Sequence, residues 1–387
     1  MNIDRGIIQY GRQWIDKRDI TEVAKILGSD FLTQGPTIEK FERKVATYCG
    51  VRFAVAFSSG TAALHGACFA AGISSGDEVI TTPLTFAASA NCILYCGGRP
   101  VFADIERKTG LIDPLQIEKK ITQRTKAIIP VDYAGQPTNY DEIKKIAKKN
   151  NLIIIADAAH SFGAKYKGRK VGSLVDMTVF SFHPIKTITT GEGGMVLTDN
   201  KNFIERLRIF RTHGITKDRK DFVDVDQGPW YYEMQELGFN YRLTDIQAAL
   251  GITQLKRIDE FLKRRKAIAQ KYTTNFKHFP NIQLLQISTD CACAWHLYPI
   301  LLKDKLIKKK KEIVNAFEQN RIITQVHYMP VHLHPYYRKR YGFKNGDYPK
   351  SEDFYLRELS IPIYPRMADS EVQKVIDVTY SIISKYR

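Results

Sequence analysis

The sequence has no apolar run long enough to cross a membrane and no paired cysteine motif. Nothing in its 387 residues approaches the roughly 18 consecutive apolar side chains that span a bilayer. The stretch MNIDRGIIQYG lacks the apolar core of a signal peptide. None of the six cysteines forms a C-x-x-C pair, and several fall in apolar stretches, so we expect reduced, mostly buried thiols. These absences predict a soluble, cytoplasmic protein.

Acidic residues are few relative to basic ones, with 41 Asp and Glu against 58 Lys and Arg and a net charge of +17. Such a balance is typical of proteins that bind nucleic acid, an anionic membrane surface or a phosphorylated substrate, and also of a merely lysine-rich surface. The basic runs 263–266 and 308–311 fit exposed helix faces. No zinc-finger spacing or aromatic RNA-binding pattern accompanies them. We therefore expect neither nucleic acid nor a membrane as partner.

Internal repeats and low-complexity linkers are also absent, and the length exceeds what one compact core usually holds. Between residues 50 and 200, helical segments alternate with β-rich apolar runs at 52–58, 78–86, 100–105, 126–135, 152–159, 177–183 and 193–198. Unbroken apolar runs are typical of strands buried on both faces. The link between the last two runs is too short for a helical crossover, so the final strand is expected to be antiparallel. The pattern predicts an α/β fold with about seven strands, mostly parallel, and helices on both faces.

The rest of the chain predicts a second, smaller α/β unit. Thr244 and Asp245 can cap a long helix over 246–276. A strand-like run at 296–302 follows, then helical patterns at 311–320 and 369–386. We expect a large domain at 1–250 and a small C-terminal domain at 251–387 that includes the long connecting helix.

A small-residue turn follows the first apolar run, at Ser59, Gly60, Thr61 and Ala62. Ligands of mostly parallel sheets bind at the carboxyl ends of the strands. Backbone N–H groups at the start of a helix can cradle a phosphate there, and Thr61 can add a hydroxyl. The same residues can also serve only as an ordinary helix cap.

Two charged residues lie at or just after the ends of later apolar stretches. Asp157 is costly to bury unless it meets a cation, so it either caps the next turn or pairs with a protonated ring nitrogen of a cofactor. His160 could orient that carboxylate or be a satisfied core residue. Lys186, partly desolvated at the mouth of the sheet, would have a lowered pKa and could form a Schiff base with an aldehyde, with Ser181 offering a phosphate another hydroxyl. In this order, the groups supply every contact that pyridoxal phosphate (PLP) needs.

Seven motifs resemble the DegT/StrS group of sugar aminotransferases, which are fold-type-I PLP enzymes. They are SDFLTQGP (29–36), SSGTAAL (58–64), DAAHSFGA (157–164), FSFHPIKTITTGEGG (180–194), RTHG (211–214), GFNYR (238–242) and HYMPVH (327–332). They span nearly the whole chain. Within the group, residues 183–194, 229–251 and 326–337 most resemble the transaminases that form UDP-4-amino-4,6-dideoxy-N-acetyl-β-L-altrosamine in pseudaminic acid synthesis.

The resemblance implies roles for individual residues. Lys186 matches the lysine that holds the cofactor and moves the proton in catalysis, and Asp157 matches the partner of the pyridine nitrogen. The remaining implied cofactor contacts are Gly60, Thr61, Ala62 and Ser181 at the phosphate, Phe86 and His160 at the ring, and Asn240 from a neighbouring subunit. The implied substrate contacts are Tyr10, Asp30, Phe31, Leu32, Thr33, Gly60, Ser181, Asn240, His327, Tyr328, Met329 and Pro330. A shared Asn240 implies a homodimer.

The implied reaction moves the amino group of L-glutamate to C4 of a UDP-linked 4-keto-6-deoxy-N-acetylhexosamine. The alternatives are a different nucleotide-linked keto sugar, or a non-catalytic sugar-nucleotide sensor on the same fold. A sugar dehydratase of this fold is disfavoured because such relatives lack the lysine found at Lys186. Asp132 departs from the histidine of many relatives, which puts only the substrate subtype in question. We expect no metal, because His327, His332 and His334 lack acidic or cysteine partners at ligand spacing.

Overall fold

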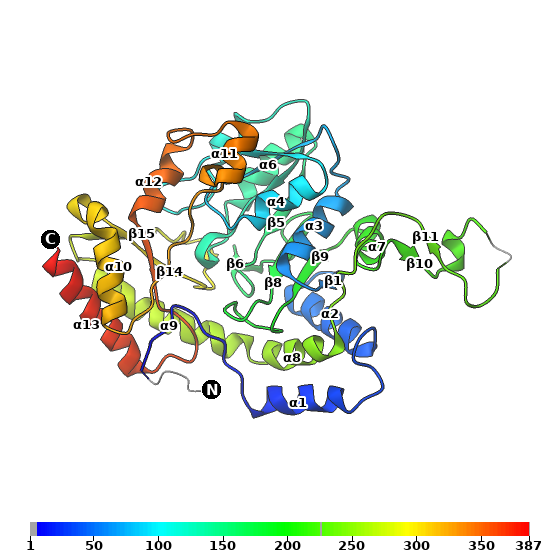
Figure 1. Cartoon of the computed structure of the whole chain (residues 1–387), viewed down its shortest axis with the longest axis horizontal. Coiled ribbons are helices and arrows are strands. Elements are labelled where there is room, and N and C mark those ends of the chain that lie inside the picture. The colour runs from blue at the N-terminus through cyan, green and yellow to red at the C-terminus, as the bar shows by residue number, and fades with distance from the viewer. Residues whose placement is uncertain (1–5, 225–226, 387) are drawn as a thin grey trace.

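The centre of the molecule is a seven-stranded sheet (Figure 1), in a computed structural model that describes residues 6–224 and 227–386. Its order is β1-β9-β8-β5-β4-β2-β3. The strands are β1 (Phe53–Phe57), β2 (Glu78–Thr81), β3 (Arg99–Phe102), β4 (Thr125–Ile129), β5 (Ile153–Asp157), β8 (Met177–Ser181) and β9 (Gly194–Thr198). β9 runs antiparallel to both β8 and β1, and the other pairs are parallel. The predicted sheet and its antiparallel final strand are confirmed.

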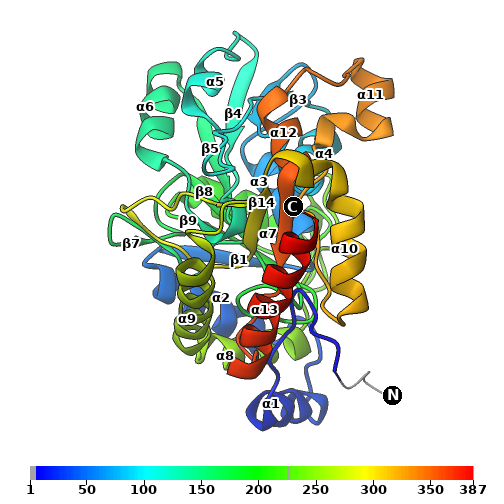
Figure 2. The same cartoon turned by 90° about the vertical axis from the view of Figure 1, so that its left-hand side faces the viewer.

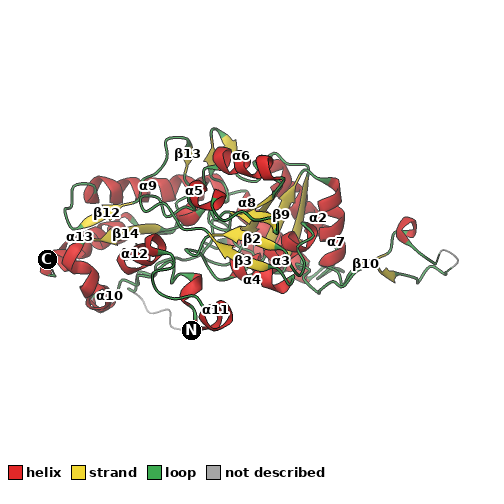
Figure 3. Cartoon of the chain, turned by 90° about the horizontal axis from the view of Figure 1, so that it is seen from above, coloured by secondary structure: helices red, strands yellow, loops and turns green. Residues whose placement is uncertain are grey.

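Both faces of this sheet are buried, which explains the unbroken apolar runs. Val55 and Phe57 pack into the core beneath α3 (Gly60–Ala70), α4 (Ala88–Tyr95) and α7 (Lys201–Phe210). Ala54 and Ala56 face the opposite core, with α2 (Pro36–Cys49) and α8 (Asp245–Leu255). Two further helices, α5 (Pro114–Glu118) and α6 (Tyr140–Asn150), cover Ile128 at the far end of the sheet. Figure 3 shows the strands lying between these groups of helices.

A second hydrophobic core lies around a three-stranded antiparallel sheet of order β12-β14-β15. Its strands are β12 (Ile282–Leu284), β14 (Tyr298–Leu302) and β15 (Glu358–Ile361), and its helices are α9 (Ile258–Phe276), α10 (Lys310–Gln319) and α13 (Asp369–Lys385). Helices α11 (Pro335–Tyr341) and α12 (Pro349–Arg357) join this part to the large sheet (Figure 2). The helices predicted at 311–320 and 369–386 correspond to α10 and α13. The domain boundary at residue 250 stays a prediction.

The long helix predicted over 246–276 is wrong in one respect, because two helices replace it. α8 ends at Leu255 and α9 begins at Ile258. Between them, Arg257 has non-helical backbone angles and its buried guanidinium pairs with Asp16 and Glu260. The ion pairs of Arg257 with Asp16 and Glu260 hold the chain in place between the two helices.

The prediction that the basic run 263–266 faces solvent is also wrong for one member. Arg265 is fully buried and donates to the backbone oxygens of Trp295, His296, Ile363 and Ile185. Four carbonyls converge there because three chain segments meet beside α9. A sequence pattern of four basic residues does not reveal such a convergence.

The remaining elements are short. They are α1 (Lys17–Leu27), which packs on α8, and the strand pairs β6 (Lys165–Tyr166), β7 (Arg169–Lys170) and β13 (Cys291–Ala292), and β10 (Ile215–Thr216) with β11 (Glu233–Met234). The segment around β10 and β11 projects from the body as an arm (Figures 1 and 3). It exposes Trp230, Leu237 and Met234. Across the residues that the structure describes, no helix is both long and apolar enough to cross a membrane.

Candidate active site at the carboxyl ends of the strands

A cavity of about 570 Å³ lies where β1, β5 and β8 end. Asp157 is the last residue of β5 and Ser181 the last of β8, while the turn that opens α3 follows β1. Tyr10 and residues 325–328 close the other side. Ten of the predicted site residues line this cavity: Tyr10, Gly60, Thr61, Phe86, Asp157, His160, Ser181, Lys186, His327 and Tyr328.

Lys186 reaches the cavity from the turn that follows β8, where its N–H donates to the His183 carbonyl. Its amine lies 3.4 Å from Nε2 of His296. Burial lowers the pKa of Lys186 to about 8, opposed by the Asp157 charge and assisted by Arg265. About one fifth of an amine with this pKa is neutral at pH 7.4, far more than of an unperturbed lysine, and the neutral form is the nucleophile.

Asp157 is held with one face toward the cavity. Its Oδ2 accepts from Ser89 Oγ at 2.6 Å and its Oδ1 from the Ala159 N–H at 3.2 Å. Burial raises the pKa of this carboxyl, while these hydrogen bonds and the Lys186 charge act in the opposite direction. A cation beside this carboxylate would offset the cost of its burial.

Two buried histidines lie beside the lysine. His160 Nε2 is 3.0 Å from the Tyr328 hydroxyl, and its ring centroid is 4.3 Å from that of His296. Burial, followed by the nearby Lys186 charge, lowers the pKa of each imidazole well below its usual range, so both are neutral. Sequence reasoning missed His296, although it begins the strand-like run at 296–302. A single histidine at the start of a run carries no signal of its own.

The start of α3 forms an anion cradle. Ser59 Oγ caps the helix by accepting from the Ala62 N–H at 3.1 Å. Within the described part of the chain, the N–H groups of Gly60 and Thr61 have no hydrogen-bonding partner. A Cβ at Gly60 would lie 2.9 Å from Ser181 Cβ, so only glycine leaves this approach open. Free N–H groups at a helix start favour a phosphate.

These groups fit PLP. The unpartnered N–H groups suit its phosphate, the Asp157 carboxylate suits its ring nitrogen, and the Lys186 amine suits its aldehyde. Phe86 is 61% exposed and lines the cavity, so its ring is available for stacking. The donor set therefore matches the cofactor from end to end.

Other predicted contacts do not line this cavity in the single chain. They are Ala62, which is buried in α3, and Asp30, Phe31, Leu32, Thr33, Asn240, Met329 and Pro330. Asp30 to Thr33 and Asn240 lie exposed on the surface. Their roles stay predictions.

Asp132 lies outside the cavity. It is fully buried and accepts from the Thr138 N–H, the Tyr140 hydroxyl and the Ser161 hydroxyl. Burial raises its pKa to about 7. This carboxyl organises the loop after β4 and does not line the cavity.

Two of the three histidines in the 327–334 segment have different side-chain partners. His327 Nδ1 lies 2.9 Å from Ser360 Oγ, and His332 Nε2 lies 3.0 Å from Glu352 Oε1. Among the residues described here, no group of three or more His, Cys, Asp or Glu side chains is arranged to hold a metal ion.

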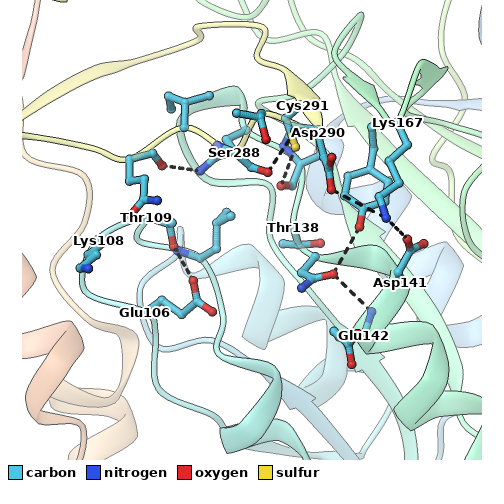
Figure 4. Close-up of a pocket in the computed structure, with 18 of the residues that line it drawn as sticks. Glu106, Lys108, Thr109, Thr138, Asp141, Glu142, Lys167, Ser288, Asp290 and Cys291 are labelled. Carbon is cyan, nitrogen blue, oxygen red and sulfur yellow. Dashed lines mark hydrogen bonds and ion pairs between the residues drawn. The ribbon is translucent and has the colours of Figure 1, made fainter.

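A larger surface hollow of about 1110 Å³ lies beside α6 (Figure 4). One of its lysines, Lys167, pairs with two of its carboxylates, Asp141 at 2.7 Å and Asp290 at 3.7 Å. It contains no predicted cofactor or substrate contact. Size alone therefore does not identify the site.

The fold and this constellation define the class of protein: a fold-type-I, PLP-dependent aminotransferase. Residues 13–379 match the DegT/DnrJ/EryC1/StrS aminotransferase family, and the chain belongs to it. It is a PLP-dependent sugar aminotransferase.

Several relatives resemble nearly the whole chain. This chain is 46% identical to the uncharacterized protein MJ1066 of Methanocaldococcus jannaschii. It is 41% identical to the spore coat polysaccharide biosynthesis protein SpsC of Bacillus subtilis. Each match covers 97% of this chain and 97% of the relative. It is 39% identical to a UDP-4-amino-4,6-dideoxy-N-acetyl-beta-L-altrosamine transaminase of Campylobacter jejuni, over 98% of this chain and 99% of that one. The structure of Helicobacter pylori PseC, an aminotransferase of pseudaminic acid biosynthesis, superposes with a TM-score of 0.92, 34% identity and coverage of 98% and 100%.

Proposed function

We propose that the chain transfers the amino group of L-glutamate to C4 of UDP-2-acetamido-2,6-dideoxy-β-L-arabino-hex-4-ulose, giving UDP-4-amino-4,6-dideoxy-N-acetyl-β-L-altrosamine. The observation that carries the aminotransferase chemistry is the Lys186 amine, with a pKa lowered to about 8, in one cavity with the Asp157 carboxylate. The sugar assignment is supported by the 39% identity to the Campylobacter jejuni transaminase.

Each residue of the cavity has a proposed task. The N–H groups of Gly60 and Thr61, with Ser181, would hold the cofactor phosphate, and Asp157 would hold its ring nitrogen. Bound PLP supplies an electron sink for the carbanion formed when the amino-acid α-proton is removed. Lys186 would carry that proton, first as base and then as acid, which suits an amine with a pKa near 8.

Phe86, His160 and Tyr328 would shape the rest of the cavity. The Phe86 ring lies 6.2 Å from the Tyr328 ring, and Tyr328 holds the Nε2 side of His160. These aromatic groups would restrict the orientation of a bound ring and exclude water from the Lys186 amine. Tyr10 and His327, from outside the large sheet, would face the sugar.

A second substrate assignment is favoured by a specific observation. SpsC and MJ1066 are more similar to this chain than the altrosamine transaminases are, at 41% and 46% identity against 39%. Another nucleotide-linked keto sugar is therefore the alternative acceptor. A sugar with its ketone at C4 and a sugar with its ketone at C3 would place the carbonyl carbon at different positions relative to the Lys186 amine.

We further propose a homodimer with shared sites. The arm exposes Trp230 (77%), Leu237 and Met234, a run of apolar side chains that a partner surface would cover. Asn240 is exposed at the base of this arm, where its backbone bridges to Thr212. From there it would complete the phosphate site of the neighbouring subunit.

A panel assay tests the substrate. PLP-loaded enzyme and L-glutamate are incubated with UDP-linked 4-keto-6-deoxy and 3-keto sugars, and the products are analysed by NMR. We expect amination of the L-arabino 4-keto sugar, with its kcat/KM at least about tenfold above that of the other sugars. A higher kcat/KM for another keto sugar would assign the alternative acceptor, and Lys186→Ala controls for background amination.

A further inference from the structure

His327 begins a buried chain of hydrogen bonds that leads away from the cavity. Its Nδ1 lies 2.9 Å from Ser360 Oγ, and Ser360 donates to Glu358 Oε1 at 2.5 Å. Glu358 Oε2 accepts from the backbone N–H of His327 at 2.7 Å. Glu358 and Ser360 lie on β15 and are almost completely buried, so bulk water does not compete for these bonds.

The protons available along this chain determine which tautomer the His327 imidazole adopts. An ionised carboxylate only accepts, so with Glu358 ionised the single Ser360 proton points to it. The Ser360 oxygen must then accept from Nδ1–H of His327. Burial lowers the pKa of His327 to about 3, so the ring is neutral and its Nε2 carries a lone pair. Within the described residues Nε2 has no hydrogen-bonding partner, and the ring lines the cavity.

Protonation of Glu358 reverses both side-chain hydrogen bonds, the one between Glu358 and Ser360 and the one between Ser360 and His327. The carboxylic acid then donates to Ser360, Ser360 donates to Nδ1, and Nε2 of His327 carries the proton. Burial raises the pKa of Glu358, while Ser360, the His327 N–H and the Lys310 charge oppose that rise. Because these influences oppose one another, both the ionised and the protonated form of Glu358 are populated near neutral pH.

We propose that Glu358 and Ser360 are positioning residues of a proton relay that switches His327 between acceptor and donor at the cavity. The inference rests on the proposed function, because it assigns His327 to the oxygen of the bound carbonyl substrate. A ketone oxygen that is replaced by nitrogen leaves as water and must gain protons. His327 Nε2 gives one, Ser360 replaces it at Nδ1, and Glu358 replaces the proton of Ser360.

The proton returns in the other half of the cycle. Release of 2-oxoglutarate takes up a water molecule, which must lose a proton to become the ketone oxygen. His327 Nε2 takes that proton, Nδ1–H passes to Ser360, and the Ser360 proton passes to Glu358. The relay therefore takes up one proton, which ends on Glu358, and gives one back in the other half-reaction. No electron moves, and Glu358 returns to its starting state after each pair of half-reactions.

Several other titratable groups face this relay and contribute to its pH response. Glu358 is faced by Lys310 of α10, by Tyr133 after β4, and by Tyr328. His327 is faced by Lys186, His160, His296 and Tyr10. Of these, Lys310 and Lys186 are the amines that carry positive charge when protonated, and burial lowers the pKa of each to about 8.

The direct test is the tautomer of His327 in the PLP-loaded enzyme. With ¹⁵N-labelled histidine, one-bond N–H coupling identifies the protonated ring nitrogen, and His327→Gln assigns the signals. We expect Nδ1–H at about pH 9 and a shift to Nε2–H toward about pH 6. An Nε2–H form at high pH, or one tautomer at both, would overturn the relay. This measurement needs no substrate, so it is independent of which sugar is aminated.

Ser360→Ala breaks the relay while keeping the backbone bonds of Ser360 to Gln325. We expect kcat to fall by about 10- to 100-fold with KM changed less than about threefold, and the pH-dependent switch of His327 to disappear. Ser351→Ala is the matched control, because Ser351 is also buried and donates to a carboxylate, Asp104, at 2.6 Å. Equal loss of kcat in both variants, or an unchanged tautomer switch in Ser360→Ala, would contradict the proposal.

Discussion

Lys186 combines a position at the mouth of the sheet with an environment that favours its neutral form. The amine is protonated below its pKa, and burial lowers that pKa to about 8. The free-amine fraction therefore rises across neutral pH instead of near pH 10. This is the property that an amine needs to capture an aldehyde under physiological conditions.

Covalent capture of PLP by the ligand-free protein should follow this titration. Its rate should rise about tenfold from pH 7 to pH 9 and then level off, whereas a lysine with an unperturbed pKa near 10.4 would give about a hundredfold rise and no plateau. Borohydride trapping at timed intervals measures the rate, and Lys186→Ala gives the blank. A rate that still rises steeply above pH 9 would refute the lowered pKa.

Gly60 is predicted to be essential for cofactor affinity rather than for folding. In Gly60→Ala the new Cβ would meet Ser181 Cβ at 2.9 Å and Oγ at 3.1 Å, closing the cradle at the start of α3. We expect the Kd for PLP to rise by about tenfold or more, which is about 1.4 kcal/mol. Gly28→Ala, where a Cβ has no contact closer than 3.8 Å, is the control for titration by PLP absorbance. Equal affinity of the two variants would argue against the cradle.

At the residue scale, the sequence predicted groups that follow strands and missed those that reach the site from elsewhere. Asp157 ends the apolar stretch of one predicted strand and Lys186 follows the run 177–183, so the rule for parallel sheets locates them. His296 and Arg265 come from the second half of the chain, and only the packing of that half against the sheet brings them to Lys186. No local pattern encodes that approach.

At the element scale, α9 connects the two cores through Arg265. This one guanidinium bonds to carbonyls beside Lys186, in the 295–296 segment and after β15. The segments that carry Lys186 and His296 are thereby held in a fixed relation. The sequence predicted a helix here, but not its start at Ile258, because no local pattern indicates that Arg257 leaves helical geometry and pairs with the distant Asp16.

Removing that guanidinium should destabilise the protein strongly. Arg265→Met would leave four buried carbonyls without their donor, and we expect a loss of about 3–5 kcal/mol in the free energy of unfolding. Urea denaturation of the variant measures it. Lys266→Met, at an exposed position of the same helix, should leave stability unchanged. Comparable midpoints for the two variants would exclude the proposed connecting role.

At the scale of the whole molecule, the seven-stranded sheet with its antiparallel β9 was predictable because apolar runs and loop lengths are local features. The projecting arm was not, since the polar and aromatic residues around β10 and β11 lack a periodic pattern. An exposed apolar arm is typical of a segment that packs on another subunit.

Mixing two inactive variants tests the shared site. In a mixed dimer of Lys186→Ala and Asn240→Ala subunits, one site has both defects and the other has neither, so random pairing should restore about one quarter of wild-type activity. Subunits are exchanged under mild denaturation and assayed, with a mass of twice 44.3 kDa expected by light scattering. Activity equal to the mean of the separate variants would mean that Asn240 acts within its own subunit.

The central claim is that Lys186 transfers the proton in this cavity, and a half-reaction tests it most directly. PLP-loaded wild-type protein is mixed with L-glutamate alone, and 2-oxoglutarate is counted while the visible absorbance is followed. One 2-oxoglutarate per chain, loss of the yellow colour, and at least about a thousandfold slower release by PLP-loaded Lys186→Ala is the predicted result. Release of 2-oxoglutarate by that variant at the wild-type rate would contradict the assignment.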